Sequence, residues 1–212
     1  IINIITKHAI DTQGSLLSAA GGSARESSSA GRYGGSIGNN GYYRVYGKWL
    51  DRPAPAGSGD ETHDALNVGQ AGFRADWVSR KGDNFTFQGD VYRGDAETVG
   101  ILVDPADPFD DRVASTDLRG QDLLFRWTSV QSPRSDTTFQ AFYDHTARTD
   151  TGMVLEGQMF DADFQQHFKA GKRNDLVWGA RYRASTSRAD GPGLQLVRHS
   201  NESSSASAFI QD

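Results

Sequence analysis

The 212-residue sequence contains no cysteine, which excludes a disulfide framework, a thiol nucleophile and a cysteine-ligated metal. Its net charge of -5 shows no basic excess, so we predict no nucleic-acid partner. No run approaches the roughly 18 consecutive apolar residues of a membrane helix, which excludes a helical membrane protein. The opening residues, IINIITK, lack the features of a signal peptide and an initiator methionine, so we interpret the chain as an internal fragment.

Apolar and polar residues alternate along most of the chain, a pattern that predicts β-strands. In GYYRVYGKWL (41–50), Tyr43, Val45 and Trp49 belong to one row, while Arg44 and Lys48 belong to the other. Similar alternation occurs at 70–79, 84–93, 120–130, 136–145, 159–168 and 175–183, and more weakly at 14–22, 28–37 and 205–212. We therefore expect about ten strands of roughly nine to eleven residues, the length that a tilted strand needs to cross a bilayer.

The connections between these strands alternate between short and long. Short, turn-rich segments are expected at 38–40, 80–83, 132–135 and 170–174, and longer polar links at 22–27, 51–69, 94–119, 147–157 and 185–203. In an up-and-down sheet all short turns then lie at one end. Outer-membrane barrels have this asymmetry, whereas soluble sandwiches mix their connections.

The two faces of the predicted strands differ in chemistry. All four tryptophans fall in apolar rows, and Trp77, Trp127 and Trp178 lie beside short turns, as expected for an aromatic girdle at the lipid headgroups. Tyr43, Phe85, Phe139 and Phe168 join them. The opposite rows contain Arg44, Lys48, Arg74, Asp76, Gln88, Asp90, Arg126, Gln140, Asp144, Asp161, Asp163, Gln165, Arg181 and Arg183.

A Lys or Arg on the lipid face near mid-membrane costs about 2–4 kcal/mol, so we assign the tryptophan-bearing rows to lipid and the charged rows to a wet interior. The predicted fold is all-β: an antiparallel up-and-down transmembrane β-barrel, here incomplete. A soluble antiparallel sheet with one solvated face shows the same alternation and stays an alternative.

Three stretches resemble one family of membrane proteins. INIITK (2–7) followed by DTQG (11–14) resembles the junction between plug and barrel in TonB-dependent outer-membrane receptors, the siderophore and iron-complex receptor family. RYGGSIGNNGYYRVYGKW (32–49) resembles their second and third barrel strands, and SASAFIQD (205–212) a strand about halfway round the barrel. The resemblance implies that residues 1–10 end the plug domain and that 11–212 form the N-terminal part of the barrel, about ten of some 22 strands.

The resemblance also implies a function. Such receptors take up a scarce ligand, typically a ferric siderophore, across the outer membrane of a Gram-negative bacterium, with energy supplied through the TonB complex. The implied partners are that complex, an iron–siderophore or other small ligand, and outer-membrane lipid. Haem, cobalamin, a nickel chelate and an oligosaccharide stay open as ligands, and a passive porin, a small outer-membrane barrel enzyme or a soluble all-β binding module stay open as functions.

No nucleophile, base and orienting acid stand at a recognisable spacing, so we predict no enzyme activity, no catalytic residues and no cofactor. Residues in the long links are candidates for ligand contact and favour an anionic iron chelate: Phe109, Arg112, Arg148 and Arg198. The acidic stretch DPADPFDD offers weak calcium candidates, Asp104, Asp107, Asp110 and Asp111, but it lacks the spacing of an EF-hand and reads better as a solvated loop.

The charged rows contain arginines and aspartates that can form ion pairs. We expect most of the inward arginines to pair with aspartates on neighbouring strands, while the remainder could hold plug carboxylates or an anionic ligand. These arginines are Arg44, Arg74, Arg126, Arg181 and Arg183, and their expected partners are Asp76, Asp90, Asp144, Asp161 and Asp163.

Overall fold

The computed structural model describes residues 6–22, 26–54, 65–101, 111–150, 153–171, 173–191 and 200–212, with the backbone alone at 98–101 and 111–114. Within these described residues, a 3-10 turn, η1 (Ala9–Thr12), precedes ten strands. The strands are β1 (Gly14–Gly21), β2 (Ser27–Ile37), β3 (Gly41–Arg52), β4 (Leu66–Val78), β5 (Asn84–Ile101), β6 (Asp111–Ser132), β7 (Ser135–Asp150), β8 (Met153–Ala170), β9 (Asn174–Asp190) and β10 (Ser200–Gln211). None of the described segments is a helix long and apolar enough to cross a membrane.

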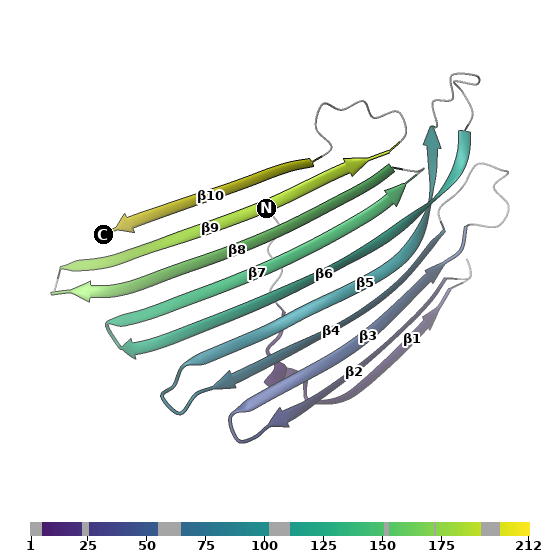
Figure 1. Cartoon of the computed structure of the whole chain (residues 1–212). Coiled ribbons are helices and arrows are strands. Elements are labelled where there is room, and N and C mark those ends of the chain that lie inside the picture. The colour runs from purple at the N-terminus through teal and green to yellow at the C-terminus, as the bar shows by residue number, and fades with distance from the viewer. Residues whose placement is uncertain are drawn as a thin grey trace.

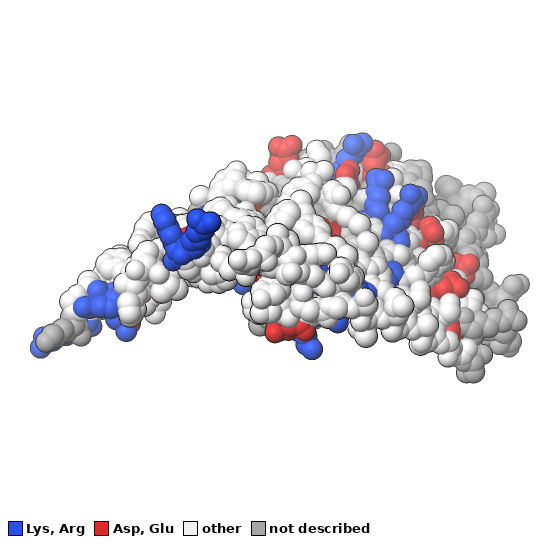
Figure 2. Space-filling model, turned by 90° about the horizontal axis from the view of Figure 1, so that it is seen from below, with Lys and Arg blue, Asp and Glu red and all other residues white. Residues whose placement is uncertain are grey.

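All ten strands form one antiparallel sheet in which spatial order follows chain order, from β1 to β10 (Figure 1). Every strand except the first and last pairs on both sides, and among the described residues β1 and β10 do not pair with each other. Viewed from below, the sheet is bent rather than flat (Figure 2). The structure therefore confirms an all-β, up-and-down antiparallel sheet, and this sheet is not closed.

The four short turns lie where the sequence predicted them. They connect β2 to β3, β4 to β5, β6 to β7 and β8 to β9 at one end of the sheet. Three contain a glycine with positive φ, at Gly38 (60°), Gly82 (89°) and Gly171 (73°), a conformation that side chains with a Cβ rarely adopt. Arg134 of the β6–β7 turn donates a hydrogen bond to the carbonyl of Gly171, which ties two neighbouring turns together.

The expected strand lengths were wrong, because the observed strands run from 8 residues in β1 to 22 in β6. The long links expected at 94–119 and 147–157 were also wrong in their bounds. β5 continues to Ile101 and β6 begins at Asp111, while β7 continues to Asp150 and β8 begins at Met153. Beyond the apolar rows of the outer face, side chains on both faces of the sheet can be polar. The alternation of apolar and polar residues then ends before the backbone hydrogen bonding between the strands does. Pairs such as Asp117 with Thr149 show that the ladder between β6 and β7 extends past the last apolar row.

The register places side chains in rows across the sheet, and we call the face with the tryptophans the outer face. One row runs through five consecutive strands, β4 to β8, and consists of Trp77, Phe85, Trp127, Phe139 and Phe164. The rings of Trp77 and Phe85 stack with centroids 5.1 Å apart and planes 9° apart. The predicted band of aromatic residues beside the short turns is therefore present on one face of the sheet.

The other face, the inner face, holds the predicted charged rows. Arg44, Arg74 and Gln88 are direct cross-strand neighbours there. The same row continues into Leu124 and Phe142 before it reaches charged residues again, so the inner face is not polar throughout.

Candidate functional site

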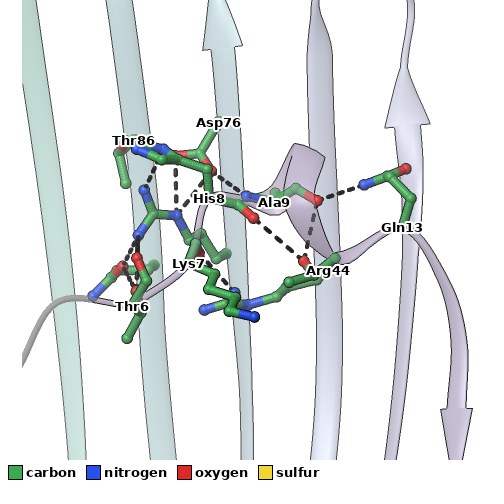
Figure 3. Close-up of polar contacts among 11 residues, drawn as sticks. Thr6, Lys7, His8, Ala9, Gln13, Arg44, Asp76 and Thr86 are labelled. Carbon is green, nitrogen blue, oxygen red and sulfur yellow. Dashed lines mark hydrogen bonds and ion pairs between the residues drawn. The ribbon is translucent and has the colours of Figure 1, made fainter.

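The N-terminal segment Thr6–Gln13, which we call the leader, lies across the inner face of the first strands (Figure 3). Its 3-10 turn is held locally: the Asp11 amide donates to the carbonyl of His8 at 3.1 Å, and the Gln13 side-chain amide donates to the carbonyl of Ala9 at 2.6 Å. Ala9 and Thr12 are buried against the sheet. The leader is thus a compact turn docked on the sheet.

Asp76 of β4 is the centre of this docking site. Its carboxylate accepts a hydrogen bond from the backbone amide of Ala9 at 2.7 Å, which fixes the start of the 3-10 turn. It also accepts from Arg74 Nε at 2.8 Å and from the hydroxyl of Thr86 on β5 at 2.7 Å. One carboxylate therefore connects the leader to two strands, and its side chain is only 16% exposed.

Two arginines in the row next to Asp76 bind the leader. Arg74 donates to the hydroxyl of Thr6 at 2.8 Å, and its other terminal nitrogen lies 3.0 Å from His8 Nδ1. Arg44 on β3 donates to the carbonyl of Lys7 at 2.7 Å. Arg44 and Arg74 face each other directly across β3 and β4, where like charges are unfavourable, and the leader's oxygen atoms help to compensate them.

Gly34 of β2 allows the backbone of the leader to lie close to the sheet. A Cβ at this position would lie 3.0 Å from the Cα of Gln13 and closer still to the carbonyl oxygen of Thr12. Both are backbone atoms, which cannot move aside as the end of a flexible side chain can. Only glycine therefore leaves room for the leader to pass over β2 in this position.

The expected pairing of the inward arginines with aspartates on neighbouring strands is confirmed for two of them. Arg181 and Arg183 of β9 pair with Asp161 of β8, at 2.8 and 2.7 Å. The expectation was wrong for the other three. Arg74 pairs with Asp76 of its own strand, β4. Arg44 donates to a leader carbonyl, because the leader passes directly over it, and Arg126 donates to the Gln140 side chain at 2.9 Å, because Gln140 is its cross-strand neighbour.

Three aspartates that face inward form a row that the sequence did not single out. Asp90, Asp122 and Asp144 are direct neighbours on β5, β6 and β7. The hydroxyl of Tyr46 donates to Asp90, and the Gln70 side chain also donates to it at 3.2 Å. Alternation within the strand 120–130 already places Asp122 on the same face as Arg126, but its position beside Asp90 and Asp144 requires the register between strands.

Of the candidate ligand contacts, Arg148 is the one whose side chain is described. It lies on β7 next to a hollow of about 470 Å³ near the long connections, which is also lined by Tyr92, Leu118 and Leu155. Its guanidinium group donates to Asp150 at 2.8 Å and is about half exposed. The site therefore offers a cation beside apolar and aromatic walls.

The remaining candidates lie largely outside the described residues. Phe109, Arg198, Asp104, Asp107 and Asp110 belong to undescribed segments, and Arg112 and Asp111 are described by backbone alone in β6. Within the parts of the chain that the structure covers, no group of three or more His, Asp or Glu side chains could hold a metal ion.

Comparisons of the chain with protein-family models, with curated proteins and with solved structures found no match.

Proposed function

We propose that the chain is part of a TonB-dependent outer-membrane receptor that takes up a scarce ligand, a ferric siderophore or a similar iron complex. One observation carries the proposal. A single sheet has an aromatic-bordered apolar band on one face and, on the other, a polar site that holds an N-terminal segment. A transmembrane barrel wall with a plug inside it needs both.

The height of the apolar band on the outer face is close to that of the apolar band of outer-membrane barrels. Along β5 the outer face changes from Phe85, in the aromatic row, to Arg93 eight residues later. At about 3.4 Å per residue this is roughly 27 Å along the strand, or about 20 Å across a membrane for a strand tilted by about 40°. The apolar band of outer-membrane barrels is about 25 Å tall.

In this proposal the leader is the end of the plug. Two of its anchoring contacts use backbone atoms, the amide of Ala9 and the carbonyl of Lys7. Charge-assisted hydrogen bonds of this kind are about twice as strong as neutral ones. They would keep the plug attached to the wall while other plug segments move during transport.

The open edges support a larger barrel. In lipid, each unpaired backbone group costs several kcal/mol, so β1 and β10 need partners before the sheet can span a membrane. Further strands would close the barrel at a size near 22, and the hollow beside Arg148 would then lie inside it near the long connections. A cation there suits an anionic iron chelate.

The exposed apolar side chains disfavour a soluble sheet. Trp49 and Val91 are each 53% exposed and Leu123 is 43% exposed, all on the outer face. Soluble monomers rarely expose apolar patches larger than a few hundred Å².

The test uses the four tryptophans of this chain, since all of them lie on the outer face, and obtains their signal as the difference from variants in which each is replaced by phenylalanine. The full-length protein, as the cell makes it, is reconstituted in bilayers that contain lipids brominated on their acyl chains. We expect strong quenching of tryptophan fluorescence by bromine and weak quenching by aqueous acrylamide. Efficient acrylamide quenching without bromine quenching would refute the membrane assignment.

Active transport is tested separately. Uptake of a radiolabelled ferric siderophore by cells that express the receptor should stop when a protonophore is added. Uptake that continues would favour a passive pore.

A further inference from the structure

The short turns carry positive charges that have no carboxylate partner. Exposed cations lie on three successive turns: Arg80 and Lys81 between β4 and β5, Arg134 between β6 and β7, and Arg173 between β8 and β9. Within the described part of the chain none of these four side chains forms an ion pair, and Arg134 donates to the neutral carbonyl of Gly171. Figure 2 shows Lys and Arg side chains at intervals along the left part of the sheet, which is this end.

The acids at the same end are already occupied. Asp83 accepts a hydrogen bond from a serine hydroxyl of its own turn at 3.2 Å. Asp136 and Asp175 both pair with His167, and all three lie on the inner face. The Asp212 carboxylate accepts from the backbone amide of Asp175 at 2.9 Å. The exposed cations of the turns are therefore available to an external anion.

In the proposed barrel these cations lie close to lipid headgroups. Tryptophan rings of the aromatic row mark the boundary between hydrocarbon and headgroups. Arg80 follows Trp77 by three residues, roughly 10 Å along the strand, or about 8 Å across a membrane for a strand tilted by about 40°. A headgroup layer is about 5–8 Å thick on each side of the hydrocarbon core, and long Lys and Arg side chains bend back towards it. Their charged ends can therefore reach phosphate groups.

The cations are spread along an edge of the sheet. Adjacent short turns are two strands apart, which is about 9–10 Å. This spacing is close to the Debye length of about 8 Å at physiological ionic strength, so the turns repel one another only weakly. Such an arrangement suits a row of separate headgroups better than one compact ligand.

We propose that the short-turn end of the sheet binds anionic phospholipids of the phosphatidylglycerol type in the periplasmic leaflet. The phosphodiester of each lipid accepts hydrogen bonds from the cations of one turn, and the acyl chains lie along the aromatic row. No acid beside these cations is free to hold an ammonium group, which favours an anionic lipid over a zwitterionic one. The inference rests on the proposed function, because it requires the short turns to lie at the periplasmic side of a bilayer.

The experiment measures lipid bound to the full-length receptor. Purified protein is placed in nanodiscs of phosphatidylethanolamine with a minor share of phosphatidylglycerol, and the lipid that the protein retains is counted by native mass spectrometry. Phosphatidylglycerol should be enriched over its share in the nanodisc. The triple variant Arg80→Gln/Lys81→Gln/Arg173→Gln should lose about tenfold or more of that enrichment, since each cation near an anionic lipid surface contributes about fivefold to binding. Arg134 is kept because it also connects two turns.

The matched control removes the same three positive charges from the half of the sheet nearer the long connections. It is Arg52→Gln/Arg93→Gln/Arg188→Gln. Each of these arginines pairs with a carboxylate, of Glu26, Asp117 and Asp190 respectively. The control should leave the enrichment of phosphatidylglycerol unchanged.

Equal enrichment in the wild type and the turn variant would overturn the proposal and would favour an acidic periplasmic protein as the partner of these cations. Equal losses in the two triple variants would also overturn it, since net charge and not position would then be responsible. Failure of the proposed function is distinguishable from both outcomes. In that case bromine quenching of the tryptophans would be absent from the wild type and from every variant, whereas unchanged quenching shows that each variant is inserted.

Discussion

Replacement of Gly34 by alanine tests whether the leader is held against the sheet by close packing. The added Cβ would meet the Gln13 Cα at 3.0 Å and the Thr12 carbonyl at a shorter distance, whereas carbon atoms pack best at about 3.5–4.0 Å. The leader must therefore shift by roughly 0.5 Å or more. Overpacking of this kind costs about 1–3 kcal/mol.

This cost of about 1–3 kcal/mol falls on the docked state of the leader, since β2 stays folded whether or not the leader is docked. Undocking should become about 5–160 times more frequent. Hydrogen exchange of a peptide that spans residues 6–13 measures this directly, because the amide of Ala9 is protected by Asp76 and that of Asp11 by the carbonyl of His8. Exchange in the strands should stay unchanged.

Gly31→Ala is the control on the same strand. A Cβ there would meet only the end of the Leu17 side chain, at 3.3 Å, and would not touch the leader. This variant should leave exchange in residues 6–13 at the wild-type rate. If Gly34→Ala left it unchanged as well, close packing of the leader over β2 would be the wrong explanation for its position.

Three further predictions concern other parts of the sheet. Asp76→Asn should weaken leader docking by about 2–3 kcal/mol, because it leaves the partly buried Arg74 without its carboxylate. Proteolysis of the leader should therefore become faster. Asp163→Asn is the control, since Asp163 lies in the same row but does not contact the leader, and it should leave the proteolysis rate unchanged. His167 lies at the short-turn end, beyond the aromatic row. Hydrogen bonds to the carboxylates of Asp136 and Asp175 raise the pKa of His167 above its usual 6.5. The resulting stabilisation is fully present below pH 6.5 and is lost as pH rises through the raised pKa, so hydrogen exchange near this turn should accelerate with pH more in the wild type than in His167→Gln, after correction for intrinsic rates. Trp77→Ala removes a stacked pair with centroids 5.1 Å apart and should lower stability by about 3–5 kcal/mol in urea unfolding from bilayers; unchanged unfolding would argue against the aromatic row as an anchor.

The sequence by itself determined the faces, the turns and the order of the strands. Side chains alternate with a period of two in any strand, so the assignment of Trp127 and Arg126 to opposite faces needed no partner strand. Turn-forming residues such as Gly82 identified the turns for an equally local reason, and in the structure this glycine has a positive φ.

Only the tertiary structure decided which side chains meet. The row of Asp90, Asp122 and Asp144 and the Arg44–Arg74 pair depend on register between strands, which alternation within one strand does not contain. The same holds for the leader, whose path over Gly34 and towards Asp76 joins residues 67 positions apart. Local chemistry determines the face on which a residue lies, whereas its neighbours on that face depend on long-range backbone pairing.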